Sequence, residues 1–189
     1  MGRAEGVTLN RSRIVLSSAD RLAEPTFKAV TLVRASMEES AGIYARESSY
    51  LDRYVQLGYA SGKVLNVAFP ADRPGDAEES HDLLDRIDAY LEGEPDSFED
   101  VDVALTLPTD QREVLETVRM LPYGEDAFVE QIARMTASLD AENDDDHRLV
   151  REALEANPAP LLVPDHRVRD GPSAAPPQVE QKLRLLEDL

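Results

Sequence analysis

The sequence predicts an α+β protein in which a small sheet with one covering helix precedes a helical unit. Between residues 42 and 69 the apolar residues alternate with a period of two, which is typical of strands. After residue 108 they recur every three or four positions, which is typical of helices. A chain of 189 residues can bury a core as one large domain or two small ones. We divide it into an extension (1–36), a mixed α/β domain (37–98) and a helical domain (99–189).

The extension differs in charge from the rest of the chain. It holds six Arg or Lys against three Asp or Glu, a net charge of +3, so the remaining residues carry −21 of the total of −18. A basic segment without a sustained period is expected to be disordered, although residues 27–33 could form a short strand or helical turn. One interpretation of this shift in charge is an upstream start, with Met37 as the natural initiator; the alternative is that the extension belongs to the protein.

Composition limits the chemistry. The chain has no Cys, which excludes disulfides, thiolate metal sites and thiol nucleophiles, and favours an intracellular, cytoplasmic protein. It shows neither a signal peptide nor an apolar run of the roughly 18 residues that span a membrane. No cofactor and no metal site is indicated. The spread of acids along the chain is similar to that in proteins of salt-loving organisms, and in molar salt a negative net charge does not exclude a DNA partner.

Three strands are expected in the first domain, at residues 43–45, 54–59 and 64–69. Residues 60–63 are suited to a tight turn, so the last two strands are predicted to form a hairpin. A helix is expected over residues 76–91, because one helical stripe collects the apolar residues Leu83, Leu84, Ile87, Tyr90 and Leu91. Gly93 lies where that helix should end. Residues 94–108 are expected to connect to the second domain.

Four helices are expected in the second domain. The first begins with Thr109 as its cap and ends before Leu121, and the others cover residues 126–139, 147–156 and 178–189. The two middle helices are short and joined by a turn, which is compatible with a helix-turn-helix.

Residues 157–168, which we call the proline loop, combine rigidity with chemically capable side chains. Three prolines fix φ and remove backbone donors, so the segment must run extended outside any helix. At its end Asp165, His166 and Arg167 place an acid, a titratable base and a fixed cation in consecutive positions. This combination indicates the lining of a site.

Several motifs together resemble the alkylguanine-DNA alkyltransferases, also called methylated-DNA-protein-cysteine methyltransferases, whose hallmark is Pro-Cys-His-Arg-Val after an Asn-Pro segment. The matching segments are Leu121-Pro-Tyr-Gly-Glu125, Gln131-Ile-Ala-Arg134, Arg148-Leu-Val150, Asn157-Pro158 and Leu162-Val-Pro-Asp-His-Arg-Val168. The likeness covers roughly residues 42–189. It implies a ribonuclease-H-like amino-terminal domain and a winged helix-turn-helix carboxy-terminal domain.

The resemblance also implies roles for single residues. The family flips an alkylated guanine out of the duplex into a pocket and transfers the alkyl group irreversibly to the Cys thiolate. Arg148 matches the Arg that fills the gap left by the flipped base, and we add Arg151 and Phe128 as DNA-binding residues. Asn157 matches the Asn that holds the loop, and His166 matches the base that activates the thiol. The implied base pocket consists of Asn157, Val163, Pro164, Asp165, His166, Arg167 and Val168.

Four departures affect the transfer chemistry. The acceptor Cys is replaced by Asp165. The family's nucleotide-contacting Tyr aligns with Val129, with Phe128 beside it, and residues 171–177 replace a loop rich in Tyr and Gly. The carboxy-terminal Glu that orients the His falls at Leu189, although Glu187 is near. A carboxylate is a weaker nucleophile toward carbon than a thiolate, so stoichiometric alkyl transfer is not expected.

We therefore interpret the chain as a non-catalytic, alkyltransferase-like monomer that binds double-stranded DNA containing alkylated guanine and assists other repair proteins. One alternative is an interaction or regulatory module that no longer binds DNA, which the acids at residues 140–146 favour. Another is hydrolytic dealkylation or base removal by Asp165 and His166. Asp165 could instead accept backbone hydrogen bonds or pair with Arg167 or Arg169, and Arg148 could pair with a neighbouring Asp.

Overall fold

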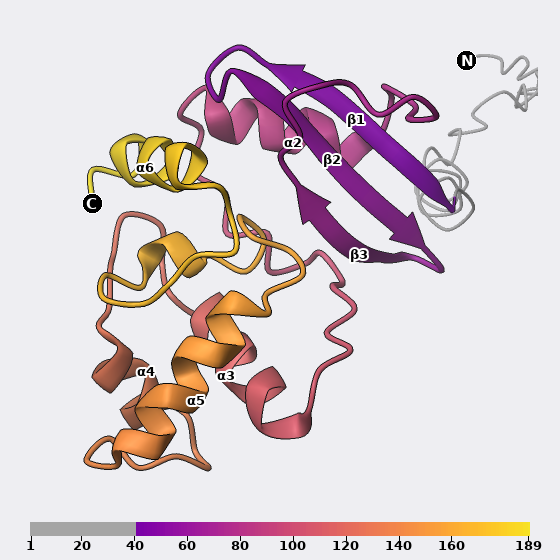
Figure 1. Ribbon diagram of the computed structural model, residues 1–189. Coiled ribbons are helices and arrows are strands. Elements are labelled where there is room, and N and C mark those ends of the chain that lie inside the picture. Colours follow the sequence, from indigo (N-terminus) through magenta and orange to yellow (C-terminus); the bar gives the residue numbers. More distant parts are fainter. Residues whose placement is uncertain (1–40) are drawn as a thin grey trace, which may run out of the picture.

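The computed structural model of the protein describes residues 41–189 (Figure 1). The expected extension, the element at residues 27–33 and the interpretation of Met37 as initiator lie outside the described residues. Within residues 41–189 no helix has both the length and the apolar character that crossing a bilayer requires. The described chain is α+β, as the sequence predicts, with a three-stranded sheet ahead of a group of helices.

The sheet is antiparallel in the order β1-β2-β3, formed by Gly42–Ser48, Arg53–Ala60 and Lys63–Ala68. This confirms the three predicted strands and the hairpin. Tyr44 faces Leu57 across one pair of strands, and Leu57 faces Val67 across the other, so these buried side chains share one face. Ser61 and Gly62 both have positive φ, 53° and 75°, as the tight turn between two twisted strands requires.

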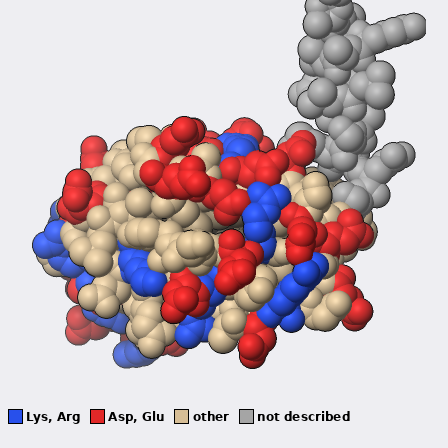
Figure 2. Space-filling view, turned by 90° about the horizontal axis from the view of Figure 1, so that it is seen from above, with Lys and Arg blue, Asp and Glu red and all other residues tan. Residues whose placement is uncertain are grey.

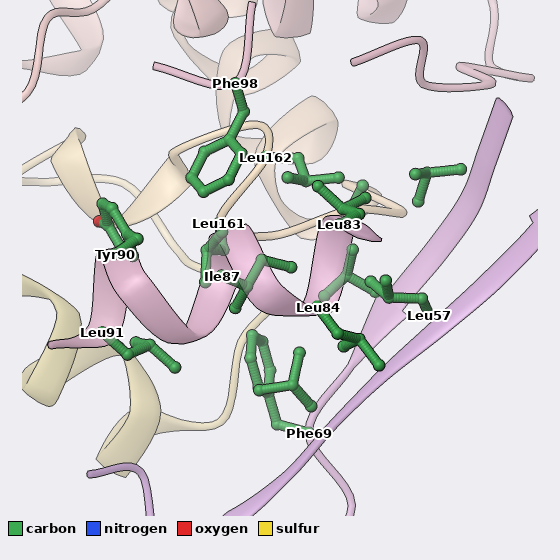
Figure 3. Close-up of a cluster of buried hydrophobic side chains, with 14 of the residues drawn as sticks. Leu57, Phe69, Leu83, Leu84, Ile87, Tyr90, Leu91, Phe98, Leu161 and Leu162 are labelled. Carbon is green, nitrogen blue, oxygen red and sulfur yellow. The ribbon is translucent and has the colours of Figure 1, made fainter. Parts of the chain in front are cut away.

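Helix α2 (Asp82–Leu91) packs its apolar stripe against that face (Figure 3). The prediction that the helix begins at residue 76 is wrong. Glu78 instead pairs with the edge of β1, where its N–H donates to Ile43 O at 2.9 Å and its carbonyl accepts from Ala45 N–H at 2.8 Å. His81 then caps the helix, because its Nδ1 accepts the N–H of Leu83.

The connection after α2 also extends the sheet. Val64 N–H donates to Asp102 O at 2.9 Å and Ala104 N–H donates to Val64 O at 2.8 Å, so the connection pairs with the outer edge of β3. Helix α3 follows as Thr109–Arg119. Thr109 is its first residue rather than its cap, because the carbonyl of Pro108 accepts the N–H of Arg112.

Helices α4 (Val129–Met135), α5 (Asp144–Glu155) and α6 (Pro177–Leu186) complete the fold. Helix α4 begins later than predicted, because Ala127 ahead of it pairs with the strand-like segment around Val168. It also ends earlier, because Thr136 after it has an extended backbone. Helix α5 begins three residues earlier than predicted, since Asn143 caps it by accepting the N–H of Asp145. Helices α3, α4 and α5 pack on one another, with α4 and α5 forming the expected pair.

Two hydrophobic clusters form the core, and the proline loop joins them. The first combines the sheet, α2 and α6 with Leu161 and Leu162 of the loop, and Figure 3 shows both leucines beside α2 and Phe98. The second combines α3, α4 and α5 with Val163 and Val168. Because the loop contributes to both clusters, packing fixes it from two sides.

Candidate functional site

The proline loop is held in shape by Asn157, which is 5% exposed. Its Nδ2 donates to Val163 O at 3.0 Å and its Oδ1 accepts the N–H of Ala159 at 3.0 Å. Leu161 has a φ of 84°, a conformation that L residues seldom adopt. Its side chain is buried in the first cluster, so packing stabilises a strained backbone at this point.

Asp165 is buried beneath the segment that follows the loop, with 1% of its surface exposed. Its carboxylate accepts three hydrogen bonds: from Asn157 Nδ2 at 2.8 Å, from Ser173 Oγ at 2.7 Å and from Ala174 N–H at 3.0 Å. Burial raises the pKa of Asp165 above its ordinary value, and these three donors oppose the rise. The carboxylate therefore serves as a hydrogen-bond acceptor inside the protein, and one of its donors is a backbone amide.

Glu187, just after α6, collects the other two side chains of the motif. His166 Nε2 lies 3.0 Å from Glu187 Oε1, and the Arg167 guanidinium donates to both oxygens at 2.8 and 2.9 Å. The Tyr90 hydroxyl and the Gly124 N–H also donate to this carboxylate. Burial alone would raise the pKa of Glu187, but the hydrogen bonds from His166 and Arg167 hold it far below its ordinary value.

The partner of His166 is thus Glu187, and the expectation that this role falls at Leu189 is wrong. A sequence signal for Glu187 exists: it continues the apolar stripe of α6, four residues after Leu183 and eight after Val179. An acid on the buried face of a helix needs a partner. Tyr90 and Ser173, by contrast, carried no signal, because their roles depend on contacts between distant segments.

The two titratable side chains of the motif turn to different partners. Asp165 binds Asn157, Ser173 and Ala174, whereas His166 binds Glu187. Within residues 41–189, Nδ1 of His166 is the buried side-chain polar atom without a hydrogen-bond partner. A neutral ring that donates from Nε2 leaves Nδ1 as an acceptor. No acid-base pair between Asp165 and His166 is formed in this arrangement.

The remaining members of the implied pocket, Val163, Pro164 and Val168, are buried with them, and Arg167 is 3% exposed. Arg167 also donates to Leu121 O at 2.6 Å. The alternative in which Asp165 pairs with Arg167 or Arg169 is not found, because Arg167 pairs with Glu187 and Arg169 with Asp126. In the described part of the chain, no group of three or more His, Cys, Asp or Glu could hold a metal ion.

The three residues expected to bind DNA lie at the surface. Arg148 is on the exposed side of α5 and pairs with Asp145 at 2.9 Å. Arg151, one turn further on, reaches Asp170 at 3.5 Å, and Asp170 also accepts the N–H of Val129 at the start of α4. Phe128, next to Val129, is 46% exposed. Asp170 therefore links Arg151 on α5 to the start of α4, next to Phe128.

Comparison with known proteins identifies the family of this chain. The family described as 6-O-methylguanine DNA methyltransferase, DNA binding domain, matches residues 109–188. A methylated-DNA–protein-cysteine methyltransferase from Methanopyrus kandleri is 33% identical over 129 residues, which cover 66% of this chain and 93% of the relative. The chain belongs to the methylated-DNA–protein-cysteine methyltransferase family. A second methyltransferase of this name, from Metallosphaera sedula, is 31% identical over 56% of this chain and 64% of its own length.

Solved structures of methyltransferases share the fold. Mycobacterium tuberculosis O6-methylguanine methyltransferase has a TM-score of 0.59 at 21% identity, covering 78% of this chain and 92% of that chain. A complex of the Mycobacterium tuberculosis protein OGT with DNA gives the same TM-score and identity, covering 78% and 91%. The Pyrococcus kodakaraensis enzyme has a TM-score of 0.58 at 20% identity, covering 78% and 100%. This chain is a methyltransferase-family member whose 189 residues include no cysteine.

Proposed function

We propose that this methyltransferase-family protein is a non-catalytic, alkyltransferase-like DNA-binding protein that recognises alkylated guanine and assists repair. The observation that carries the proposal is the state of the acceptor position. Asp165 takes the place of the Cys, and its carboxylate is bound by three donors inside the protein. A carboxylate engaged in this way is a poor nucleophile, and no thiol exists elsewhere in the chain.

The scaffold around that position supports a binding role. Asn157 still orders the loop, and His166 and Arg167 are still fixed by a buried carboxylate. On the surface, Arg148 and Arg151 project from the same side of α5, the second helix of the predicted helix-turn-helix. A related methyltransferase has been solved with DNA, which supports assigning a duplex as the partner of this chain.

The test is a duplex-binding assay in molar KCl and at lower salt, with O6-methylguanine or guanine at the central position. We expect tighter binding of the alkylated duplex, and a loss of about ten-fold in affinity when Arg148 is changed to Ala. Arg73→Ala is the matched control, because Arg73 is also an exposed arginine paired with one acid, Glu79, but lies in the loop before α2. Failure to bind either duplex at any salt concentration would refute the proposal.

One observation favours a second function, that of a protein-interaction module. The first turn of α5 presents Asp144, Asp145 and Asp146, and Asp145 pairs with Arg148. Carboxylates at a helix amino terminus stabilise the helix but would repel phosphates near the same surface. If this function is correct, any residual duplex binding will be weak, and Arg148→Ala will leave it unchanged.

A further inference from the structure

Residues 171–176, which we call the cover segment, are tied to the proline loop through one carboxylate. Ser173 Oγ donates to Asp165 Oδ1 at 2.7 Å, and Ala174 N–H donates to Asp165 Oδ2 at 3.0 Å. Ala174 is exposed and Ser173 is partly buried, whereas Asp165 is 1% exposed. The cover segment therefore lies between Asp165 and solvent.

The same carboxylate is also bound from within the proline loop. Asn157 Nδ2 donates to Asp165 Oδ2 at 2.8 Å while it also donates to Val163 O at 3.0 Å. Ser173 Oγ in turn accepts the N–H of Ala175 at 3.1 Å, which bends the cover segment around its own side chain. Asp165 is thus the common acceptor that joins the start of the proline loop to the cover segment.

Hydrogen bonds to a charged acceptor that is shielded from water are among the stronger ones in proteins. An alanine or a serine at position 165 could not accept from all three donors, because neither side chain carries two acceptor oxygens. The contact depends on the carboxylate that replaces the family's Cys, and it is therefore a property of this chain.

We propose that Asp165 is an autoinhibitory latch, in which the carboxylate holds the cover segment closed against the proline loop until a flipped base displaces it. This inference rests on the proposed function, because it concerns the admission of a base beside residue 165. A base placed there must displace the side chain of Asp165 and free Ser173 and Ala174. Binding of alkylated DNA is then coupled to opening, and the closed population lowers the apparent affinity.

The contact itself is tested without DNA, by hydrogen-deuterium exchange of the Ala174 amide followed by NMR. Asp165→Asn keeps the size of the side chain but offers one acceptor oxygen, and Ser173→Ala removes one donor. Both variants should exchange at least about ten-fold faster than the wild type at Ala174. Ser138→Ala is the matched control, since Ser138 Oγ also donates to a carboxylate, that of Glu113, at an exposed position. Unchanged exchange in both latch variants would overturn the inference.

Chemical rescue separates a latch from general loosening. Asp165→Ala leaves three donors around an empty space, into which formate can place a carboxylate. We expect excess sodium formate to slow exchange of Ala174 in this variant, whereas the same concentration of sodium chloride leaves it unchanged. Equal effects of the two salts would count against a carboxylate-specific latch.

The functional part is tested by the affinity of the same variants for duplex DNA. Asp165→Asn and Ser173→Ala should bind an O6-methylguanine duplex more tightly than the wild type, by up to about ten-fold, and Ser173→Ala should leave the affinity for the guanine duplex unchanged. Equal or weaker binding of the alkylated duplex by variants with faster exchange would overturn autoinhibition. If no form binds either duplex, the proposed function has failed, and the exchange experiment still decides whether Asp165 holds the cover segment.

Discussion

Glu187 is the buried carboxylate that pairs with Arg167 and His166. It accepts hydrogen bonds from His166, Arg167, Tyr90 and Gly124, and its side chain is fully buried. Arg167 is 3% exposed, so its guanidinium has little access to water. Removing one partner of a buried ion pair leaves the other charge uncompensated. This loss lowers the stability of the folded state by more than the intact pair contributes to it.

We expect Glu187→Ala to lower the free energy of unfolding by about 3–5 kcal/mol, measured by urea denaturation near neutral pH. Glu180→Ala is the control from the same helix, because Glu180 forms only a partly exposed pair with Arg184 at 3.8 Å. That change should stay within about 0.5 kcal/mol of the wild type. A similar effect of the two substitutions would show that Glu187 has no special role.

The pH dependence of this effect has a defined sign. The pKa of Glu187 is lowered in the folded protein, so its contribution is complete above its ordinary pKa of 4.5 and is lost as the pH falls below that value. The difference in stability between the wild type and Glu187→Gln should therefore shrink during an acid titration below about pH 4.5. A difference that grows on acidification would contradict the lowered pKa.

At the residue scale, the sequence identifies the side chains of the site better than their partners. The spacing of Asn157, His166 and Arg167 was enough to place them in one loop. It could not reveal that Asp165 meets Ser173, because a serine in a loop after the motif has no pattern of its own. It aligned the partner of His166 with Leu189, because alignment along α6 ignores which face of the helix is buried.

Among the elements, α5 depends on a close contact with the cover segment. A Cβ added to Gly171 would lie 2.5 Å from Leu154 Cδ1 and 3.0 Å from Val168 Cγ1. Leu154 is fully buried on α5, and Val168 belongs to the same cluster. Glycine at position 171 therefore allows the chain to pass directly over the second cluster.

Gly171→Ala should destabilise the protein by about 1–3 kcal/mol, because the added methyl group must displace packed side chains. The measurement is urea denaturation, with Gly75→Ala as the matched control. A Cβ at Gly75 meets no atom within 4 Å, and its φ is not in the left-handed region, so that substitution should be neutral or slightly stabilising. Equal stability of the two variants would show that α5 yields without strain.

Hydrophobic periodicity predicts which segments form helices better than it predicts where those helices begin. It found α2, α4 and α5 but misplaced their first residues, and for α2 and α4 the causes were contacts distant in sequence. Glu78 pairs with β1 and Ala127 pairs with the segment after the proline loop, so both segments are extended although their composition permits a helix. Such pairing is decided by tertiary structure, whereas strands β1 to β3 follow each other through short turns and were predicted correctly.

For the whole molecule, the dominant electrostatic feature is the excess of acids, with 38 Asp or Glu against 20 Lys or Arg. Figure 2 shows red carboxylates intermingled with blue cations on the face that it presents. Many arginines are engaged locally, such as Arg46 with Asp85 and Asp88, and Arg86 with Asp96 and Asp100. The excess carboxylates, which have no cation to pair with, repel one another, and this repulsion opposes the compact state.

We therefore expect the thermal midpoint to rise with KCl, by roughly 5–10 °C between low and molar salt, because screening removes a repulsion of a few kcal/mol. Most of the gain should come below about 1 M, where the Debye length falls from about 10 Å to about 3 Å. Sucrose is the control, since it stabilises by exclusion from the protein surface without screening charge. A midpoint that is flat in KCl, or that rises no faster than in sucrose, would mean that the net charge of −18 does not limit stability and that adaptation to salt is not the reason for it.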